Sequence, residues 1–102
     1  MAMISLDKVP IPNPDVISRV VSNETILVNP PMGEVKVLNE VGTRIWSLVD
    51  GRISIREIAN LICLEYQIGL EDAQDDIIEF IEQLVERNAI TLSDVPMRRE
   101  SP

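Results

Sequence analysis

The sequence predicts an α+β fold in which a three-stranded antiparallel sheet is followed by a three-helix bundle. Up to residue 38, β-branched residues occur in short runs separated by turn-forming residues, which is typical of strands. From residue 39 onward, apolar residues recur every three or four positions, which is the spacing of one face of a helix. The 102 residues are enough for one hydrophobic core but not for two, so we expect a single folded domain.

Three strands are expected, at residues 16–22, 25–28 and 34–38. The first two are rich in Val and Ile, and Asn23-Glu24 should form a turn between them. The third strand, Glu-Val-Lys-Val-Leu, alternates polar and apolar residues, so one of its faces should be buried. Because the connections are short, the three strands should form an antiparallel meander.

The first helix, predicted at residues 40–49, joins the sheet to the helical part of the chain. Asn39 is a favourable N-cap residue, and Asp50-Gly51 should end the helix because Gly adopts the left-handed conformation without steric cost. Trp46, the only Trp of the chain, should be largely buried between the sheet and the helices. The buried stripe of this helix is expected at Val41, Ile45, Leu48 and Val49.

Two longer helices are expected at residues 54–66 and 70–87. Ser54 and Glu57 should form a capping box, because each side chain can bond the backbone N–H of the other residue. The last helix is the most amphipathic segment of the chain. Its inward positions are Ala73, Ile77, Phe80, Ile81, Leu84 and Val85, and its opposite, acidic face carries Asp75, Glu79, Glu82 and Glu86.

Both ends of the chain are expected to lie outside the domain, which should span residues 15–92. Residues 1–14 contain prolines at positions 10, 12 and 14, which favour an irregular, extended arm. Ile90-Thr91-Leu92 could add a short strand at the end of the domain. Residues 93–102 should form a flexible tail.

The charge of the chain disfavours two classes of partner. The net charge is −8 and the basic residues are scattered, so we expect no binding to nucleic acid, where phosphate neutralisation dominates the affinity. The same acidity argues against binding to an anionic membrane surface. No apolar run approaches about 18 residues and the N-terminus lacks a signal-peptide core, so we expect a cytoplasmic protein.

The residue types that usually carry catalysis are missing or unsuitably placed. The sequence has no His and a single Cys, Cys63, which excludes a disulfide or a Cys/His zinc site within one chain. The four glycines are isolated, so no phosphate-binding loop is present. Asp75 and Asp76 are neighbours, but adjacent helical residues point about 100° apart. We therefore expect no enzyme, no catalytic residue, no metal site and no cofactor, and we expect Cys63 to be a buried apolar residue.

The third predicted strand offers a different kind of site. Edge strands are usually protected by proline or by charges, or else they accept another strand. Residues 34–38 contain no proline, and their only charged side chains are Glu34 and Lys36. The addition of an extended peptide to this edge is therefore physically available.

A family resemblance centres on the junction between sheet and helices. The residues that carry it are Leu38-Asn39-Glu40-Val41-Gly42, Ile45-Trp46, Leu48, Asp50-Gly51, Ile58-Ala59, Tyr66, Asp76-Ile77, Phe80-Ile81, Leu84 and Arg87. This pattern resembles the pyrroloquinoline-quinone biosynthesis protein D (PqqD) family, and the resemblance covers residues 16–92.

The resemblance implies a small, non-catalytic recognition element for ribosomally synthesised and post-translationally modified peptides (a RiPP recognition element), with a winged-helix-like arrangement of three strands and three helices. Such a peptide chaperone captures the leader of a precursor peptide as an added strand beside the third strand and the third helix. It then presents the leader to a modifying enzyme, such as a radical S-adenosylmethionine protein, or to a leader peptidase in lasso-peptide systems.

The resemblance also implies where the peptide would bind. One wall would be the third strand, and the other would be a stripe of the third helix with the spacing i, i+4 and i+7. The expected peptide-binding residues are Glu34, Val35, Lys36, Val37, Leu38, Asp76, Phe80 and Gln83. Asn39, Gly42, Trp46 and Gly51 are expected to define the fold.

Two other functions remain open at this point. A winged-helix-like fold also occurs in regulators that bind DNA, although the acidity and the lack of a basic recognition helix oppose that function here. The domain could instead dock on an enzyme without binding a free peptide. The expected partners are a precursor leader peptide and a peptide-modifying enzyme, and a homodimer is also conceivable.

Overall fold

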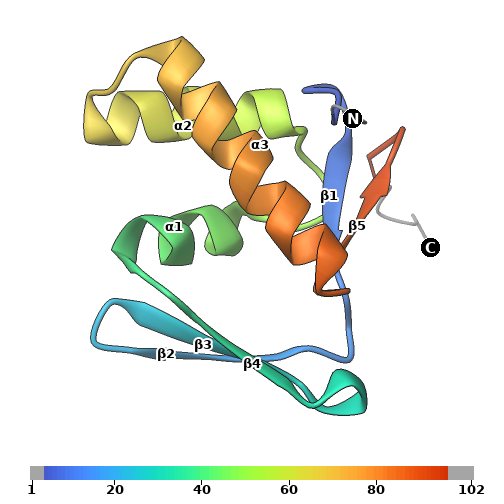
Figure 1. Cartoon of the computed structure of the whole chain (residues 1–102). Helices are drawn as coiled ribbons and strands as arrows, with labels where there is room; N and C mark the ends of the chain where they lie inside the picture. The colour runs from blue at the N-terminus through green and yellow to red at the C-terminus, as the bar shows by residue number, and fades with distance from the viewer. Residues whose placement is uncertain (1–3, 97–102) are drawn as a thin grey trace, which may run out of the picture.

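Three helices lie on one side of a three-stranded antiparallel sheet, and a second sheet of two strands lies beside them (Figure 1). The computed structural model describes residues 4–96. The strands are β1 (Val9–Pro12), β2 (Ile17–Val21), β3 (Glu24–Asn29), β4 (Glu34–Leu38) and β5 (Ile90–Ser93). The helices are the short 3-10 helix η1 (Pro30–Met32), α1 (Glu40–Leu48), α2 (Ile55–Tyr66) and α3 (Leu70–Glu86). The predicted fold class, a three-stranded antiparallel sheet followed by three helices, is confirmed.

The main sheet has the strand order β2-β3-β4, so β4 is an edge strand. A two-residue turn, Ser22-Asn23, connects β2 to β3, and both of its residues have positive φ (49° and 67°), as a type I′ turn requires. The predicted turn was one residue too late, because Glu24 already pairs with Val21 across the hairpin. The connection between β3 and β4 passes through η1 and ends at Gly33, whose φ of 66° is left-handed.

Helix α1 starts as predicted but turns a slightly different face to the core. The Asn39 side chain accepts a hydrogen bond from the Gly42 N–H at 2.8 Å, which is the predicted N-cap. Ile45 and Val49 are buried, whereas Val41 is 39% exposed, so its assignment to the buried stripe was wrong. The inward position of the first turn is Gly42, which lies about 100° around the helix from Val41.

Helices α2 and α3 end close to the predicted residues. The Ser54 hydroxyl accepts a hydrogen bond from the Glu57 N–H at 3.2 Å, and the Glu57 carboxylate accepts one from the Ser54 N–H at 3.1 Å. The predicted capping box is therefore confirmed. Gln67 after α2 and Asn88 after α3 adopt the left-handed conformation, with φ of 53° and 60°.

The core is almost entirely aliphatic and lies between α1, α2, α3 and the inner face of the sheet. Its fully buried side chains include Ile55, Ile58, Ile62, Ile77, Ile81, Leu84 and Ile90. Trp46 and Cys63 pack against this core and are partly buried, so Cys63 is less buried than predicted. Trp46 directly follows the buried Ile45, so helical geometry turns the indole about 100° away from the centre of the core.

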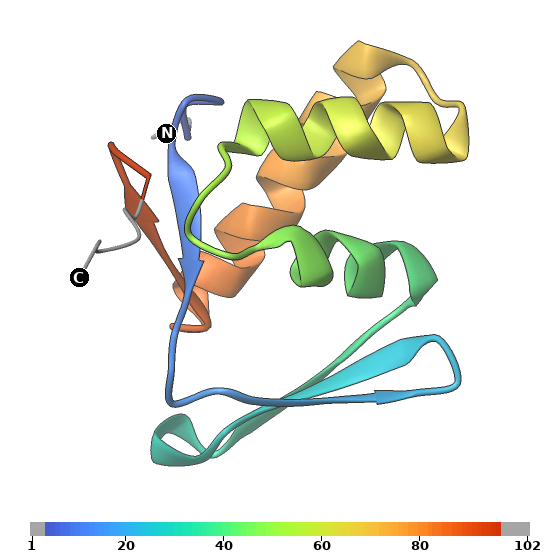
Figure 2. The same ribbon diagram turned by 180° about the vertical axis from the view of Figure 1, so that it is seen from behind.

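The N-terminal segment departs most from the prediction. Residues 9–12, expected in an irregular arm, form β1, which pairs antiparallel with β5 (Figures 1 and 2). Val9 and Pro10 are buried, and the carbonyls of Leu6, Lys8 and Pro10 accept hydrogen bonds from the chain around the α1–α2 connection. The prolines disfavour a helix but are compatible with an edge strand. The pairing of this strand with β5 is a long-range contact, which the local sequence does not indicate. Of the predicted tail, Ser93 ends β5, and residues 97–102 lie outside the described part.

Replacing Val9 tests whether β1 belongs to the folded core. Val9 is 3% exposed, so Val9→Ala should lower the free energy of unfolding by about 2 kcal/mol, the burial contribution of the lost methyl groups. Val95→Ala is the matched control, because Val95 is 66% exposed and its truncation should change little. Denaturant unfolding of both variants measures the difference, and equal stabilities would contradict the role of β1.

An ion pair joins α1 to α2 on the surface. The Arg44 guanidinium donates to both carboxylate oxygens of Glu65, at 2.7 to 3.2 Å. These hydrogen bonds lower the pKa of the Glu65 carboxyl and raise that of Arg44. Because the folded-state pKa of Glu65 is depressed, its contribution to stability is present above the unfolded value and is lost as the pH falls through the folded value.

The variant Glu65→Gln should therefore be slightly less stable than wild type at neutral pH, and the difference should vanish at acid pH. The window begins near pH 4, the ordinary pKa of a glutamate at about 4.3, and extends below it. Urea unfolding at a series of pH values gives the difference directly. A difference that persists undiminished below the titration of Glu65 would show that the ion pair is not its source.

Candidate functional site

Strand β4 presents an unpaired backbone edge. It pairs with β3 on one side, and none of the strands in residues 4–96 pairs with its other side. Its side chains alternate between the two faces of the sheet. Glu34, Lys36 and Leu38 face the helices and are partly or fully buried, whereas Val35 and Val37 point to the opposite face and are 63% and 57% exposed.

The tight turn between β2 and β3 determines which backbone groups of β4 are free. The residues that flank a two-residue turn, here Val21 and Glu24, exchange both of their backbone hydrogen bonds. Hydrogen-bonded and non-hydrogen-bonded pairs alternate along antiparallel strands, so every second residue of β3 bonds to β2. The residues in between, 25, 27 and 29, bond to β4, where they lie opposite residues 38, 36 and 34. The N–H and C=O groups of Val35 and Val37 therefore point away from the sheet, toward an empty edge.

Phe80 places one face of α3 next to β4. An atom at the Cβ position of Gly42 would lie 3.1 Å from Phe80 Cε1 and 3.3 Å from Leu38 Cβ. The absence of a side chain at Gly42 thus lets the Phe80 ring lie against the start of α1 and the end of β4. Asp76 and Gln83, one helical turn to either side of Phe80, are exposed.

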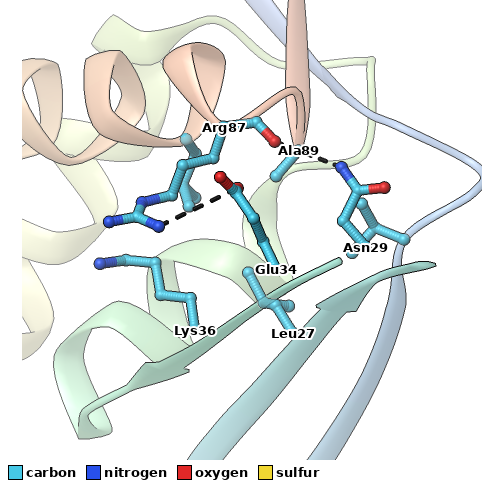
Figure 3. A pocket seen from close by; sticks show the side chains of 8 residues that line it. Leu27, Asn29, Glu34, Lys36, Arg87 and Ala89 are labelled. Atoms are coloured by element: carbon cyan, nitrogen blue, oxygen red, sulfur yellow. Dashed lines mark hydrogen bonds and ion pairs between the residues drawn. The ribbon is translucent and has the colours of Figure 1, made fainter. Parts of the chain in front are cut away.

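A small pocket lies where β4 meets the end of α3 (Figure 3). Its apolar lining comes from Val16, Leu27, Leu84 and Ala89, and its polar lining comes from Asn29, Glu34, Lys36 and Arg87. The free volume is about 20 Å³, which is room for about one water molecule. We call the free edge of β4, the Asp76–Phe80–Gln83 stripe and this pocket the β4–α3 site.

Glu34 and Arg87 face each other at the pocket (Figure 3). Arg87 Nη1 lies 4.0 Å from Glu34 Oε2, a distance at the limit of an ion pair. Glu34 Oε2 is buried and has no hydrogen-bond partner among the described residues. An unsatisfied buried carboxylate oxygen is unfavourable, so this atom is ready to accept a hydrogen bond from a donor that enters the pocket.

Asn29 holds the end of α3 against the sheet. The side chain is 6% exposed, and Nδ2 donates a hydrogen bond to the Arg87 carbonyl oxygen at 3.2 Å (Figure 3). That carbonyl lies at the C-terminus of α3, where helical carbonyl groups lack partners within the helix. The bond therefore fixes the separation between β3 and α3 at the pocket.

The structure distributes the sequence-predicted site residues over three places. Glu34 and Lys36 line the pocket, and Leu38 is buried beside Phe80. Asp76 and Gln83 are exposed on α3 next to Phe80. The side chains of Val35 and Val37 lie on the other face of the sheet, so only the backbone of these two residues belongs to the β4–α3 site.

Two polar residues of the pocket were missed from the sequence. Arg87 follows Gln83 by four positions and Phe80 by seven, so the helical spacing that selected those residues also includes Arg87. Asn29 follows Leu27 by two positions, and strand alternation puts both on the inner face. The pairing of Asn29 with the end of α3 is a tertiary contact that neither pattern contains.

A second, more open hollow of about 220 Å³ lies between the β2–β3 hairpin and the helices. Its lining is Val20, Asn23, Glu40, Thr43, Arg44, Ser47 and Tyr66. It is larger than the pocket at β4 and borders β2, the other edge strand of the sheet. However, Arg44 within it is already bonded to Glu65, whereas the pocket at β4 contains the buried acceptor Glu34 Oε2, which is unpaired within the described residues. The β4–α3 site is therefore the better candidate.

Within residues 4–96, no group of three or more His, Cys, Asp or Glu side chains is placed to hold a metal ion. None of the described helices has the length and apolar character needed to cross a membrane.

Comparison with known proteins identifies the family. The family model for coenzyme PQQ synthesis protein D (PqqD) matches residues 24–90. The chain belongs to the PqqD family. The solved structure of TbiB1 in complex with the TbiA(beta) leader peptide is similar to this PqqD-family protein, with a TM-score of 0.74 and 28% sequence identity. The similarity covers 78% of this chain and 93% of that chain, and no curated protein matches the sequence significantly.

The tie between Asn29 and α3 can be tested by truncation. Asn29→Ala in this PqqD-family protein leaves the Arg87 carbonyl without its side-chain donor, and should lower the free energy of unfolding by about 1–2 kcal/mol. Asn60→Ala, at an exposed position of α2, should be neutral or slightly stabilising because Ala favours helix. Chemical denaturation compares the two variants. If Asn29→Ala were as stable as Asn60→Ala, Asn29 would not fix the end of α3.

Proposed function

We propose that this protein is a non-catalytic adaptor that binds the leader of a ribosomally synthesised precursor peptide. The leader adds as a strand to the free edge of β4 and lies between β4 and α3. The adaptor presents the bound precursor to a peptide-modifying enzyme, which is a radical S-adenosylmethionine protein or a leader peptidase. It acts in the cytoplasm, where precursor peptides are translated.

The observation that carries this proposal is the unpaired edge of β4 beside α3. An extended peptide gains its main-chain hydrogen bonds from such an edge and its specificity from pockets that alternate along it. Membership of the PqqD family supports the proposal, as does the likeness to TbiB1, whose structure contains a leader peptide. An adaptor needs no catalytic group, which suits a chain without His.

The residues of the β4–α3 site take different parts in the proposed complex. The backbone groups of Val35 and Val37 bond the main chain of the leader. Leader side chains that face the helices contact Lys36, Leu38 and Phe80, and Asp76 and Gln83 supply polar contacts from α3. A leader side chain larger than a methyl group can enter the pocket only if the side chains of Glu34 and Arg87 move apart. These two side chains are 38% and 46% exposed, so both can move toward solvent.

Proline substitution tests strand addition directly. Val35→Pro and Val37→Pro remove an outward N–H, so the domain should stay folded while the binding free energy of the leader falls by about 1–3 kcal/mol. The measurement is calorimetric titration with leader peptides synthesised from short open reading frames beside the gene, with the TbiA(beta) leader as a further probe. Circular dichroism reports folding.

Three control variants separate the backbone from the side chain. Lys36→Pro removes an N–H that bonds β3, so this variant should lose the sheet. Val35→Thr and Val37→Thr keep the N–H and the β-branched shape, so both should bind like wild type. Folded proline variants that bind like wild type would exclude strand addition. A wild-type protein that binds no leader but binds the modifying enzyme would favour the docking-domain alternative.

The alternative of a DNA-binding regulator makes the opposite prediction about charge. In a winged-helix regulator α3 would approach the phosphates, but here α3 carries seven acidic residues: Glu71, Asp72, Asp75, Asp76, Glu79, Glu82 and Glu86. Repulsion from the phosphates should leave no measurable affinity for duplex DNA in a gel shift at about 0.15 M salt. Sub-micromolar binding under these conditions would overturn the assignment of α3 to a peptide site.

A further inference from the structure

The face of the main sheet that points away from the helices is unusually apolar. We call it the outer face. Strand register places eight side chains on it: Ile17, Arg19, Val21, Glu24, Ile26, Val28, Val35 and Val37. Six of them are aliphatic. Four of these are strongly exposed, namely Val35 at 63%, Ile17 at 60%, Val37 at 57% and Val21 at 49%.

An antiparallel sheet that faces water on one side normally carries polar residues on that side. The inner face supplies Leu27 and Leu38 to the core, whereas the valines of the outer face are not part of it. Figures 1 and 2 show the helices on the inner side, and none of the drawn helices or strands covers the outer face. A contiguous apolar patch of this kind marks a surface that meets another molecule.

The charges of the outer face point to a particular partner. The whole chain has a net charge of −8, and the acidic side of α3 would repel a second copy. The outer face carries one positive and one negative side chain, Arg19 and Glu24, so its own charge is zero. Neither makes an ion pair within residues 4–96. On a face without net charge, two acidic copies can meet with little local repulsion.

Arg19 and Glu24 also make the outer face complementary to itself. Arg19 lies on β2 and pairs in register with Ile26, two residues along β3 from Glu24. The two charges are therefore diagonal neighbours on the same face. A two-fold axis between them places Arg19 of each copy opposite Glu24 of the other, which is the relation that an isologous interface requires. Val21, Ile26 and Val37 lie around this axis and would pack sheet against sheet.

We propose that the outer face is the interface of a reversible homodimer, in which the main sheets of two copies pack face to face. Three strands of about five residues span roughly 17 by 14 Å, which is small beside the roughly 800 Å² that each partner buries in a standard interface. The dimer should therefore be weak, with a dissociation constant on the order of 100 μM. The edge of β4 remains open in this arrangement, so dimerisation and addition of a strand to β4 are compatible.

Sedimentation velocity of the full chain tests this proposal without any ligand. In about 0.15 M salt, the protein should be monomeric near 10 μM and largely dimeric near 1 mM. The double variant Val35→Thr/Val37→Thr, which preserves strand-forming shape, should raise the dissociation constant about tenfold or more. Leu64→Gln is the matched control, because Leu64 is 76% exposed on α2, away from the outer face, and its replacement should change nothing.

Charge exchange distinguishes a two-fold dimer from any other association. Arg19→Glu places two carboxylates opposite each other on both sides of the axis, so it should weaken the dimer about tenfold. Adding Glu24→Arg to that variant restores opposite charges and should restore the dimer, with circular dichroism confirming the fold throughout. A protein that stays monomeric at 1 mM would overturn the proposal. Dimerisation that Leu64→Gln weakens equally, or that the double exchange does not restore, would also overturn it.

Discussion

The register of the main sheet, set by the Ser22-Asn23 turn, is the constraint on which the candidate site depends. Both residues adopt positive φ, and the turn makes Val21 and Glu24 a hydrogen-bonded pair. Alternation then carries this assignment across β3 to β4. One local turn thereby decides that Val35 and Val37 offer free backbone groups, and that Glu34, Lys36 and Leu38 face the helices. A register shift of one residue would reverse both assignments and bury the wrong side chains.

A free strand edge is useful for peptide binding only if the opposite wall keeps its distance, and two contacts serve that purpose. At one end, Asn29 bonds the Arg87 carbonyl and joins the sheet to the last turn of α3. At the other, Gly42 allows Phe80 to approach α1 and Leu38 more closely than a larger residue would permit. The aliphatic core between α2 and α3 makes α3 rigid between these contacts. The proposed adaptor thus holds its binding edge in place before any peptide arrives, which reduces the entropy lost on binding.

The sequence predicted the parts of this structure that depend on local chemistry. Alternation located β4 at its observed residues, and the Ser54–Glu57 capping box and the Asn39 cap fixed the helix starts. The errors came from long-range contacts. Strand β1 forms because it pairs with β5. No local pattern in a proline-rich segment indicates that it will pair with a strand about 80 residues away. Likewise, the spacing that selected Phe80 and Gln83 is local, whereas the meeting of Asn29, Glu34 and Arg87 requires the sheet and α3 to be assembled first.

Hydrogen exchange of individual backbone amides tests the central claim most directly, namely that β4 offers Val35 and Val37 to a peptide strand. In the free protein, the amides of Val35 and Val37 should exchange rapidly and that of Lys36 slowly, because only the latter bonds β3. A bound leader should slow the exchange of Val35 and Val37 and leave that of Lys36 nearly unchanged. Slow exchange at Val35 and Val37 in the free protein would contradict the register. A leader that binds without protecting them would contradict strand addition.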